Sequence, residues 1–215
     1  MCSSDLRLEL TPAGADGQSR YKKIVLHTER VDAMLVDVFL QSHARPPARI
    51  VIDLDSTFAP LHGHQWGRFF HGYYDCYCYL PLYVFCGEHL LAAKLRPSDL
   101  DGAAGAQQVI RGIVERIRSA WPDTAILLRG DSGFCREPLM AWCERGGVDY
   151  LFGLARNARL GRIIGAELQW AKRAYERTGD AARVFTEFAY RTRKSWSRPR
   201  RVIADRKSTR LNSSH

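Results

Sequence analysis

The chain has 215 residues, 46% of them hydrophobic, and 32 Lys and Arg stand against 23 Asp and Glu, a net charge of +9. Its length suits one domain with part of another, and no apolar run approaches the roughly 20 residues of a membrane-spanning helix, which excludes that class. A basic excess of this size favours a polyanionic partner, nucleic acid first.

Both ends of the chain resemble the translated sequence of a common sequencing-library adapter. Residues 1–6 read MCSSDL and residues 205–215 read DRKSTRLNSSH. We therefore expect residues 1–6 and 205–215 to be non-native, and we leave them out of the fold prediction. The remaining segment, 7–204, is then expected to be a fragment of a longer protein.

Residues 7–48 are predicted to form a lead-in that contains one helix. Helical spacing at Val31–Leu40 puts Met34, Leu35, Val38 and Phe39 on one apolar side. The helix should end before Pro46-Pro47, because a residue that precedes proline disfavours helical backbone angles. A buried strand, 49–54, is expected next.

The next segments predict two more strands and a long helix. Residues 68–79 and 80–86 are aromatic and favour β-structure, and 90–95 could extend the latter strand. Ser98-Asp99-Leu100-Asp101 offers helix N-caps. The helix that follows is amphipathic and should end at Trp121-Pro122; its apolar positions are Val109, Ile110, Ile113, Val114 and Ile117.

The second half predicts a strand at 125–128, a helix at 137–145, a strand at 149–154 and a basic helical stretch at 156–177. A further strand at 183–190 reads as a new region. The order of three strands, helix, strand, helix, strand matches the ribonuclease H-like α/β fold, a mixed sheet with a three-strand meander followed by βαβ units. We therefore assign 49–180 to a partial ribonuclease H-like core and 181–204 to the start of a β-rich, basic insertion.

Two of these strands end in a carboxylate. The first runs Ile50-Val51-Ile52-Asp53-Leu54-Asp55, and the fourth runs Ile126 to Gly130 and is followed by Asp131. In a ribonuclease H-like sheet the first and fourth strands are adjacent, so Asp55 and Asp131 should be neighbours. Paired carboxylates at a sheet margin are suited to holding Mg²⁺ against a phosphate.

These motifs together resemble the DDE transposases of bacterial insertion sequences. The resemblance rests on Asp53-Leu54-Asp55-Ser56-Thr57, on His62-Gly63 with Gly67 to Asp75, and on Arg129 to Phe134, and it extends from about Tyr21 to Ala204. It implies metal-dependent DNA cleavage and strand transfer at the ends of a mobile element. It also implies two Mg²⁺ or Mn²⁺ ions in the complete enzyme, double-stranded DNA as partner, a homodimer as a family-level expectation, and a cytoplasmic, nucleoid-associated location.

By that resemblance Asp55 is the first catalytic and metal-binding acid and Asp131 the second. Asp53 is the rival for the first position, because strand alternation puts it on the same face as Asp55. The family's third acid, a glutamate on a later helix, has no counterpart here, and the role is not carried onto Glu167, Glu176 or Glu187. We therefore expect this fragment to be unable to cleave DNA.

A basic stretch near the end of the chain is the candidate DNA-binding segment. Basic residues around an aromatic ring suit phosphate contact and base stacking, although a solvated charged face would have the same composition. The candidate DNA-binding residues are Arg191, Arg193, Lys194, Trp196, Arg198, Arg200 and Arg201.

Other interpretations of the same sequence stay open. The chain could be another two-metal nuclease on this fold, such as a junction resolvase, or a DNA-binding remnant without catalysis. A serine-protease reading of Gly130-Asp131-Ser132-Gly133 is disfavoured, because no matching histidine context is present. The odd number of native cysteines, without a signal peptide, predicts reduced thiols. Cys76 and Cys78 fit core packing better than zinc binding, because the usual zinc spacing is absent.

Overall fold

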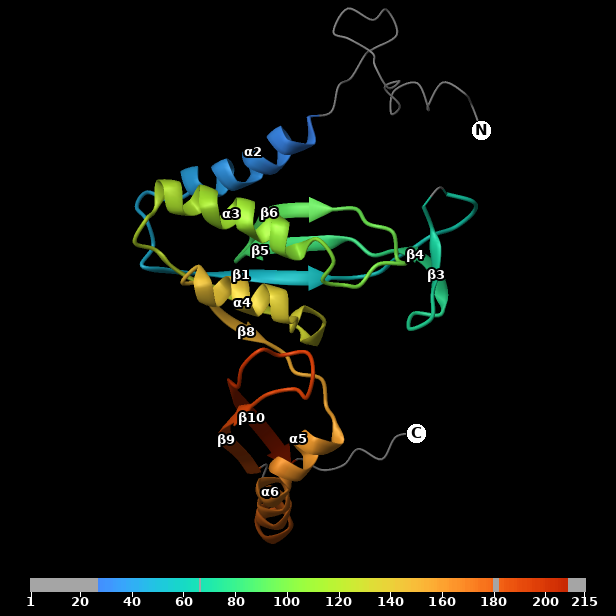
Figure 1. The fold of residues 1–215 in the computed structure, drawn as a ribbon, viewed down its shortest axis with the longest axis vertical. Helices are drawn as coiled ribbons and strands as arrows, with labels where there is room; N and C mark the ends of the chain where they lie inside the picture. The colour runs from blue at the N-terminus through green and yellow to red at the C-terminus, as the bar shows by residue number, and fades with distance from the viewer. Residues whose placement is uncertain (1–26, 66, 180–181, 209–215) are drawn as a thin grey trace, which may run out of the picture. The chain divides into compact units, whose positions relative to one another are not determined.

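The computed structural model describes residues 27–65, 67–179 and 182–208 (Figure 1). The chain divides into two compact units, Met1–Leu127 and Leu128–His215, and each is considered by itself. None of the helices in the described ranges is long and apolar enough to cross a membrane.

The first unit is built on an antiparallel meander of β1 (Arg49–Ser56), β5 (Leu82–Cys86) and β6 (His89–Lys94). Alternate residues of β1 are buried, because successive strand side chains point to opposite faces. Helix α2 (Thr28–Gln41) packs against β6 and against α3 (Ala106–Ala120). Helix α3 buries the predicted apolar face, Ile110, Ile113, Val114 and Ile117.

A small second sheet projects from this unit. It joins β2 (Ala59–Pro60), β4 (Cys76–Tyr79) and β3 (Phe69–His71) in the order β2-β4-β3. The segment 68–79, predicted as one strand, is therefore a hairpin, because residues 72–75 turn the chain and Asp75 adopts a left-handed φ of 51°. The third strand of the meander is instead β6, which the sequence suggested only as an extension.

Two further predictions for this unit are corrected. Helix α2 buries Val36 and Phe39, whereas Met34 and Val38 are each 54% exposed, because the face that meets β6 and α3 is rotated from the predicted one. Helix α3 is not capped by residues 98–101: it begins after Gly105, and the Asp101 side chain instead accepts a hydrogen bond from Ala103 N in the preceding turn.

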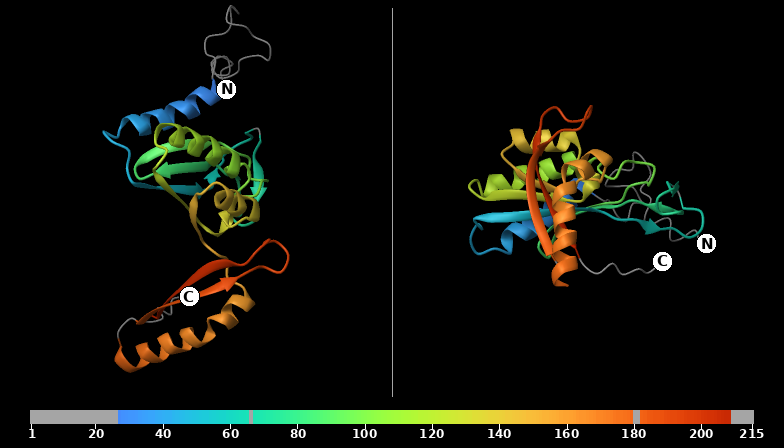
Figure 2. Two further views of the ribbon diagram at one scale, coloured as in Figure 1. Left: turned by 60° about the vertical axis from the view of Figure 1, so that its left-hand side comes forward. Right: turned by 90° about the horizontal axis from the view of Figure 1, so that it is seen from below.

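The second unit contains the end of β7 (Ala125–Gly130), the short helix η1 (Ser132–Phe134), α4 (Glu137–Arg145) and β8 (Asp149–Phe152). The predicted basic helix is broken at Ile164 into α5 (Ala158–Ile163) and α6 (Gly165–Thr178). Strands β9 (Ala182–Tyr190) and β10 (Arg200–Ser208) form an antiparallel hairpin, and α6 runs along it (Figure 2). A hydrophobic core of Met140, Leu160, Tyr190 and Trp196 joins α4, α5, β9 and the loop between β9 and β10.

Strand β10 continues past Ala204, the predicted end of the native segment, and its residues 205–208 pair with residues 182–185 of β9. The adapter-like origin of residues 205–215 stays a prediction. Residues 1–6 and 209–215 lie outside the described residues.

The main sheet has the strand order β6-β5-β1-β7-β8. In chain order β1 and β7 are its first and fourth strands, and they are hydrogen-bonded neighbours, as the sequence predicts. The predicted α/β class with a mixed sheet is therefore confirmed.

Candidate active site

Asp55 lies on β1, opposite Tyr83 of β5, and its side chain is exposed. Asp53 lies two residues earlier on the same face, is partly buried and sits opposite Phe85. The structure thus presents both rivals for the first acid on one face of one strand, with Asp55 closer to its end.

A buried arginine fixes the chain just after Asp55. Arg96 donates to Ser56 Oγ at 2.8 Å, to Leu80 O at 2.9 Å, to Ala104 O at 2.6 Å and to Gly102 O at 3.0 Å. Burial lowers the pKa of its guanidinium. Sequence reasoning missed Arg96, because nothing in its local context distinguishes it from the other arginines of a basic chain.

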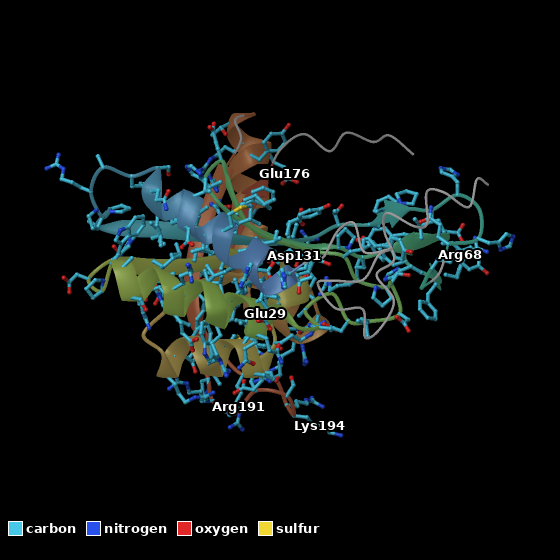
Figure 3. All side chains as sticks on the ribbon, turned by 90° about the horizontal axis from the view of Figure 1, so that it is seen from above. Glu29, Arg68, Asp131, Glu176, Arg191 and Lys194 are labelled. Atoms are coloured by element: carbon cyan, nitrogen blue, oxygen red, sulfur yellow. The ribbon has the colours of Figure 1, made fainter. Side chains whose placement is uncertain are left out.

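Asp131 directly follows β7 and is exposed (Figure 3). It is the N-cap of η1, and its Oδ1 accepts a hydrogen bond from Gly133 N at 2.8 Å. That bond orients the carboxylate through one oxygen, and Oδ2 has no hydrogen bond among the described residues. Because Oδ1 is held by the capping hydrogen bond, Oδ2 is oriented in a way that suits binding of a metal ion.

The backbone around Asp131 is closely packed against the end of β8. Gly153 N donates to Gly130 O at 3.0 Å, and a Cβ on Gly153 would lie 2.8 Å from Ser132 N. A Cβ on Gly133 would lie 2.9 Å from Asp131 Oδ1. These glycines allow the loop that carries Asp131 to lie against β8, a constraint that the sequence alone did not indicate for Gly153.

The second unit also holds a buried ion network centred on Arg200. Its side chain, 6% exposed, bonds both Glu137 and Glu144 of α4, with Nη1 2.6 Å from Glu137 Oε2 and Nε 2.7 Å from Glu144 Oε1. Tyr150 of β8 donates to Glu144 Oε1 at 2.7 Å, and Arg198 also pairs with Glu144 at 2.6 Å. The network connects β10 and its preceding loop to α4 and β8.

The pKa values of the network reflect this pairing. Burial alone would raise the pKa of Glu144, but hydrogen bonds from Arg200, Tyr150 and Arg198 outweigh it and bring the pKa to about 2. Hydrogen bonding to Arg200 likewise lowers the pKa of Glu137. Both carboxylates are therefore ionised at neutral pH, which keeps Arg200 paired in the interior.

The candidate DNA-binding residues separate into two groups. Trp196 is 8% exposed in the core and Arg200 is buried in ion pairs, whereas Arg198 and Arg201 are exposed but pair with Glu144 at 2.6 Å and with Glu187 at 2.7 Å. This corrects the expectation that Trp196 stacks on bases and that Arg200 reaches phosphate, because both side chains are enclosed. Arg191, Arg193 and Lys194 are exposed in the loop between β9 and β10, as Figure 3 shows for Arg191 and Lys194.

The cysteines outside the first 26 residues are free thiols. Cys78 is buried, which fits the predicted packing role, and Cys143 lies in the interior, where burial raises its thiol pKa to about 12. Within residues 27–65, 67–179 and 182–208 no group of three or more His, Cys, Asp or Glu residues is placed to hold a metal ion.

The family model for transposase DDE domain group 1 matches residues 3–213, nearly the whole chain. The chain belongs to the DDE transposase family. A search of curated proteins found no match. The family assignment therefore stands on the domain model and agrees with the motifs around Asp55 and Asp131.

Two solved transposase structures are similar to this DDE domain chain. One is a piggyBac transposase synaptic complex with hairpin DNA, at 14% identity and a TM-score of 0.39, covering 83% of this chain and 37% of that one. The other is a Mos1 transposase paired-end complex with the left transposon end, at 10% identity and a TM-score of 0.34, covering 75% of this chain and 59% of that one. The chain thus spans less than two thirds of the length of either structure.

Proposed function

We propose that this chain is part of a transposase that cleaves DNA strands at the ends of an insertion sequence and transfers them to a target. The observation that carries the proposal is the DDE domain match over residues 3–213. The two carboxylates that end neighbouring strands β1 and β7 support it, because that pattern is what the family's chemistry requires.

In this proposal Asp55 and Asp131 are the metal ligands, and Mg²⁺ or Mn²⁺ is the metal. Exposed carboxylates are the oxygen donors that these hard cations prefer. When bound, a pair of such ions stabilises the attacking and leaving oxygens of an in-line displacement. The chain's own contribution is to fix Asp131 through Gly133 N and the end of β1 through Arg96.

The partners and location follow from the same proposal. The DNA of the element's ends and of its target would bind the basic surface of the chain, the protein would act as a homodimer, and it would be cytoplasmic and associated with the nucleoid. Since the sequence offers no third acid, we expect the 215-residue chain by itself to bind metal and DNA without transferring strands.

Metal titration tests the assignment of the acids. Mn²⁺ binding, measured by calorimetry, should weaken by about tenfold or more in Asp55→Asn and in Asp131→Asn, because each substitution removes a charged oxygen ligand. Asp99→Asn, at an exposed carboxylate, is the matched control and should leave binding unchanged.

The same titration on Asp53→Asn decides between the rivals: a loss larger than that of Asp55→Asn would make Asp53 the first acid. Unchanged Mn²⁺ affinity in both Asp55→Asn and Asp131→Asn would remove the proposed site. Mg²⁺-dependent strand transfer by the wild-type chain would contradict the expectation that it is inactive alone.

A further inference from the structure

The hairpin of β3 and β4, residues 69–79, exposes an unusual number of aromatic rings, and we name it the aromatic hairpin. Phe70 is 54% exposed, Tyr73 86% and Tyr77 47%. Burial of aromatic rings is favourable, so a group of rings that stays exposed on one short element indicates a surface that binds a partner.

The rings are held in place by one another and by a cation. Phe70 and Tyr77 are directly opposite across the hairpin and meet edge to face, with centroids 5.6 Å apart. The Arg68 guanidinium lies over the Tyr77 ring, 4.4 Å from its centroid. At the turn, Tyr73 packs against Tyr74 with centroids 5.0 Å apart.

Arg68 itself is oriented by a backbone carbonyl and an imidazole nitrogen. It donates to Gly63 O and, at 3.0 Å, to His64 Nδ1. Neither partner is an anion, so these bonds do not neutralise the guanidinium charge. The surface therefore combines exposed ring faces with the positioned positive charge of Arg68, and the exposed carboxylate of Asp75 lies at the turn.

The aromatic hairpin is attached next to the candidate first acid. Ser98 Oγ donates to Phe69 O at 3.0 Å, and Tyr79 forms a bridge with Pro97. Arg96, two residues before Ser98, bonds Ser56 at the end of β1. The base of the hairpin is thus linked through residues 96–98 to the end of β1, the strand that carries Asp55.

We propose that the aromatic hairpin binds unpaired bases of a DNA strand by stacking on Tyr73 and Tyr77, with Arg68 contacting the strand's phosphate. Stacking of bases on aromatic side chains beside cations is the general mode of single-strand binding. The inference rests on the proposed function only in taking DNA as the partner.

The net charge of the chain, rather than that of the hairpin itself, favours this partner over a second copy of the chain. Two copies meeting through this surface would bring together two chains that each carry a net charge of +9. A polyanion instead gains from Arg68 and from the net charge. A duplex offers its bases only inside the stack, so unpaired bases fit the exposed rings.

Fluorescence anisotropy without metal tests the proposal, using a labelled thymidine oligonucleotide and a duplex of matched length. Tyr73→Ala and Tyr77→Ala should each weaken single-strand binding by about five- to hundredfold and leave duplex binding nearly unchanged. Tyr73→Phe keeps the ring and should bind as the wild type does. Trp170→Ala removes a ring that is 54% exposed on α6 and serves as the matched control.

Unchanged single-strand affinity in both alanine variants would overturn the proposal. Concentration-dependent self-association in light scattering that Tyr73→Ala abolishes would show that the surface joins two copies instead. The readouts separate the two proposals, because Mn²⁺ binding through Asp55 and Asp131 does not require these rings. Loss of the metal site with retained single-strand binding would leave this inference standing.

Discussion

The position of Asp131 depends on residues that have no side chain. Gly133 brings its N–H to the carboxylate, and Gly153 lets β8 approach the backbone at Ser132. Any larger residue at Gly153 must move backbone atoms, because the contact is with the main chain and cannot relax by a rotamer change. The capping hydrogen bond alone therefore does not fix this acid.

We expect Gly153→Ala to destabilise the protein by about 1–3 kcal/mol and to weaken Mn²⁺ binding, because its Cβ would lie 2.8 Å from Ser132 N. Chemical denaturation and metal titration measure the two effects. Gly161→Ala is the control: no atom lies within 4 Å of its Cβ, and alanine in α5 should be neutral or stabilising. Equal effects of both substitutions would argue against a role for the close contact.

At the scale of elements, β10 is attached to α4 by Arg200, whereas its neighbour Arg201 pairs across the hairpin with Glu187. Arg200 is 6% exposed and shares two carboxylates, whereas Arg201 is 68% exposed. A buried pair that loses one partner leaves uncompensated charge, whereas an exposed pair contributes little. Adjacent arginines in the same strand therefore have different structural roles.

Replacing Arg200 with methionine should destabilise the chain by about 3–5 kcal/mol, because Glu137 and Glu144 would be left without their common partner. Replacing Arg201 with methionine should destabilise the chain far less, because solvent screens this exposed pair. Urea denaturation of the two variants at neutral pH makes the comparison. A similar loss in both would mean that burial of Arg200 is not what stabilises the contact.

The acid dependence of unfolding gives a check on the same network. Because the folded-state pKa of Glu144 lies near 2, below its ordinary 4.5, its contribution is complete above pH 4.5 and is lost as the pH falls towards 2. The difference in stability between wild type and Arg200→Met should therefore narrow over that range.

Over the whole molecule, the net charge of +9 is distributed unevenly among free and paired cations. The exposed loop residues Arg191, Arg193 and Lys194 are available to phosphate, whereas Arg200 and Arg201 are engaged with glutamates. The salt dependence of DNA binding should therefore correspond to fewer phosphate contacts than the number of basic residues in the segment 191–201.

Alanine at Arg191, Arg193 and Lys194 together should reduce the slope of log K against log salt by about 3, because about 0.9 counterions are released per phosphate contact. Anisotropy with duplex DNA over a salt series measures the slope. The control removes as many charges from exposed positions outside this loop, at Arg30, Arg45 and Arg49. An equal change in both triple variants would assign the effect to net charge rather than to the loop.

Local sequence patterns predicted most of the helices and strands of the main sheet, the carboxylates at the ends of β1 and β7, and the family. These depend on local periodicity and on short motifs: the pattern at 137–145, for example, is the observed α4, because its helical spacing ends at Gly146-Gly147. The buried face of α2 was not determined in this way, since Val36 and Met34 are equally apolar and only packing against β6 and α3 decides between them.

Which charged and aromatic residues are accessible depends on the tertiary structure. The composition of residues 191–201 predicted that Trp196 and Arg200 belong to one basic surface, but both side chains are enclosed. Arg200 pairs with Glu137 and Glu144 of α4, which are distant in sequence, and the core of the second unit covers Trp196. Residues 69–79 show the opposite case, an aromatic side chain that is exposed. They contain a turn that the sequence analysis did not predict, and this turn leaves Tyr73 exposed. Burial depends on contacts between distant segments, which local patterns do not encode.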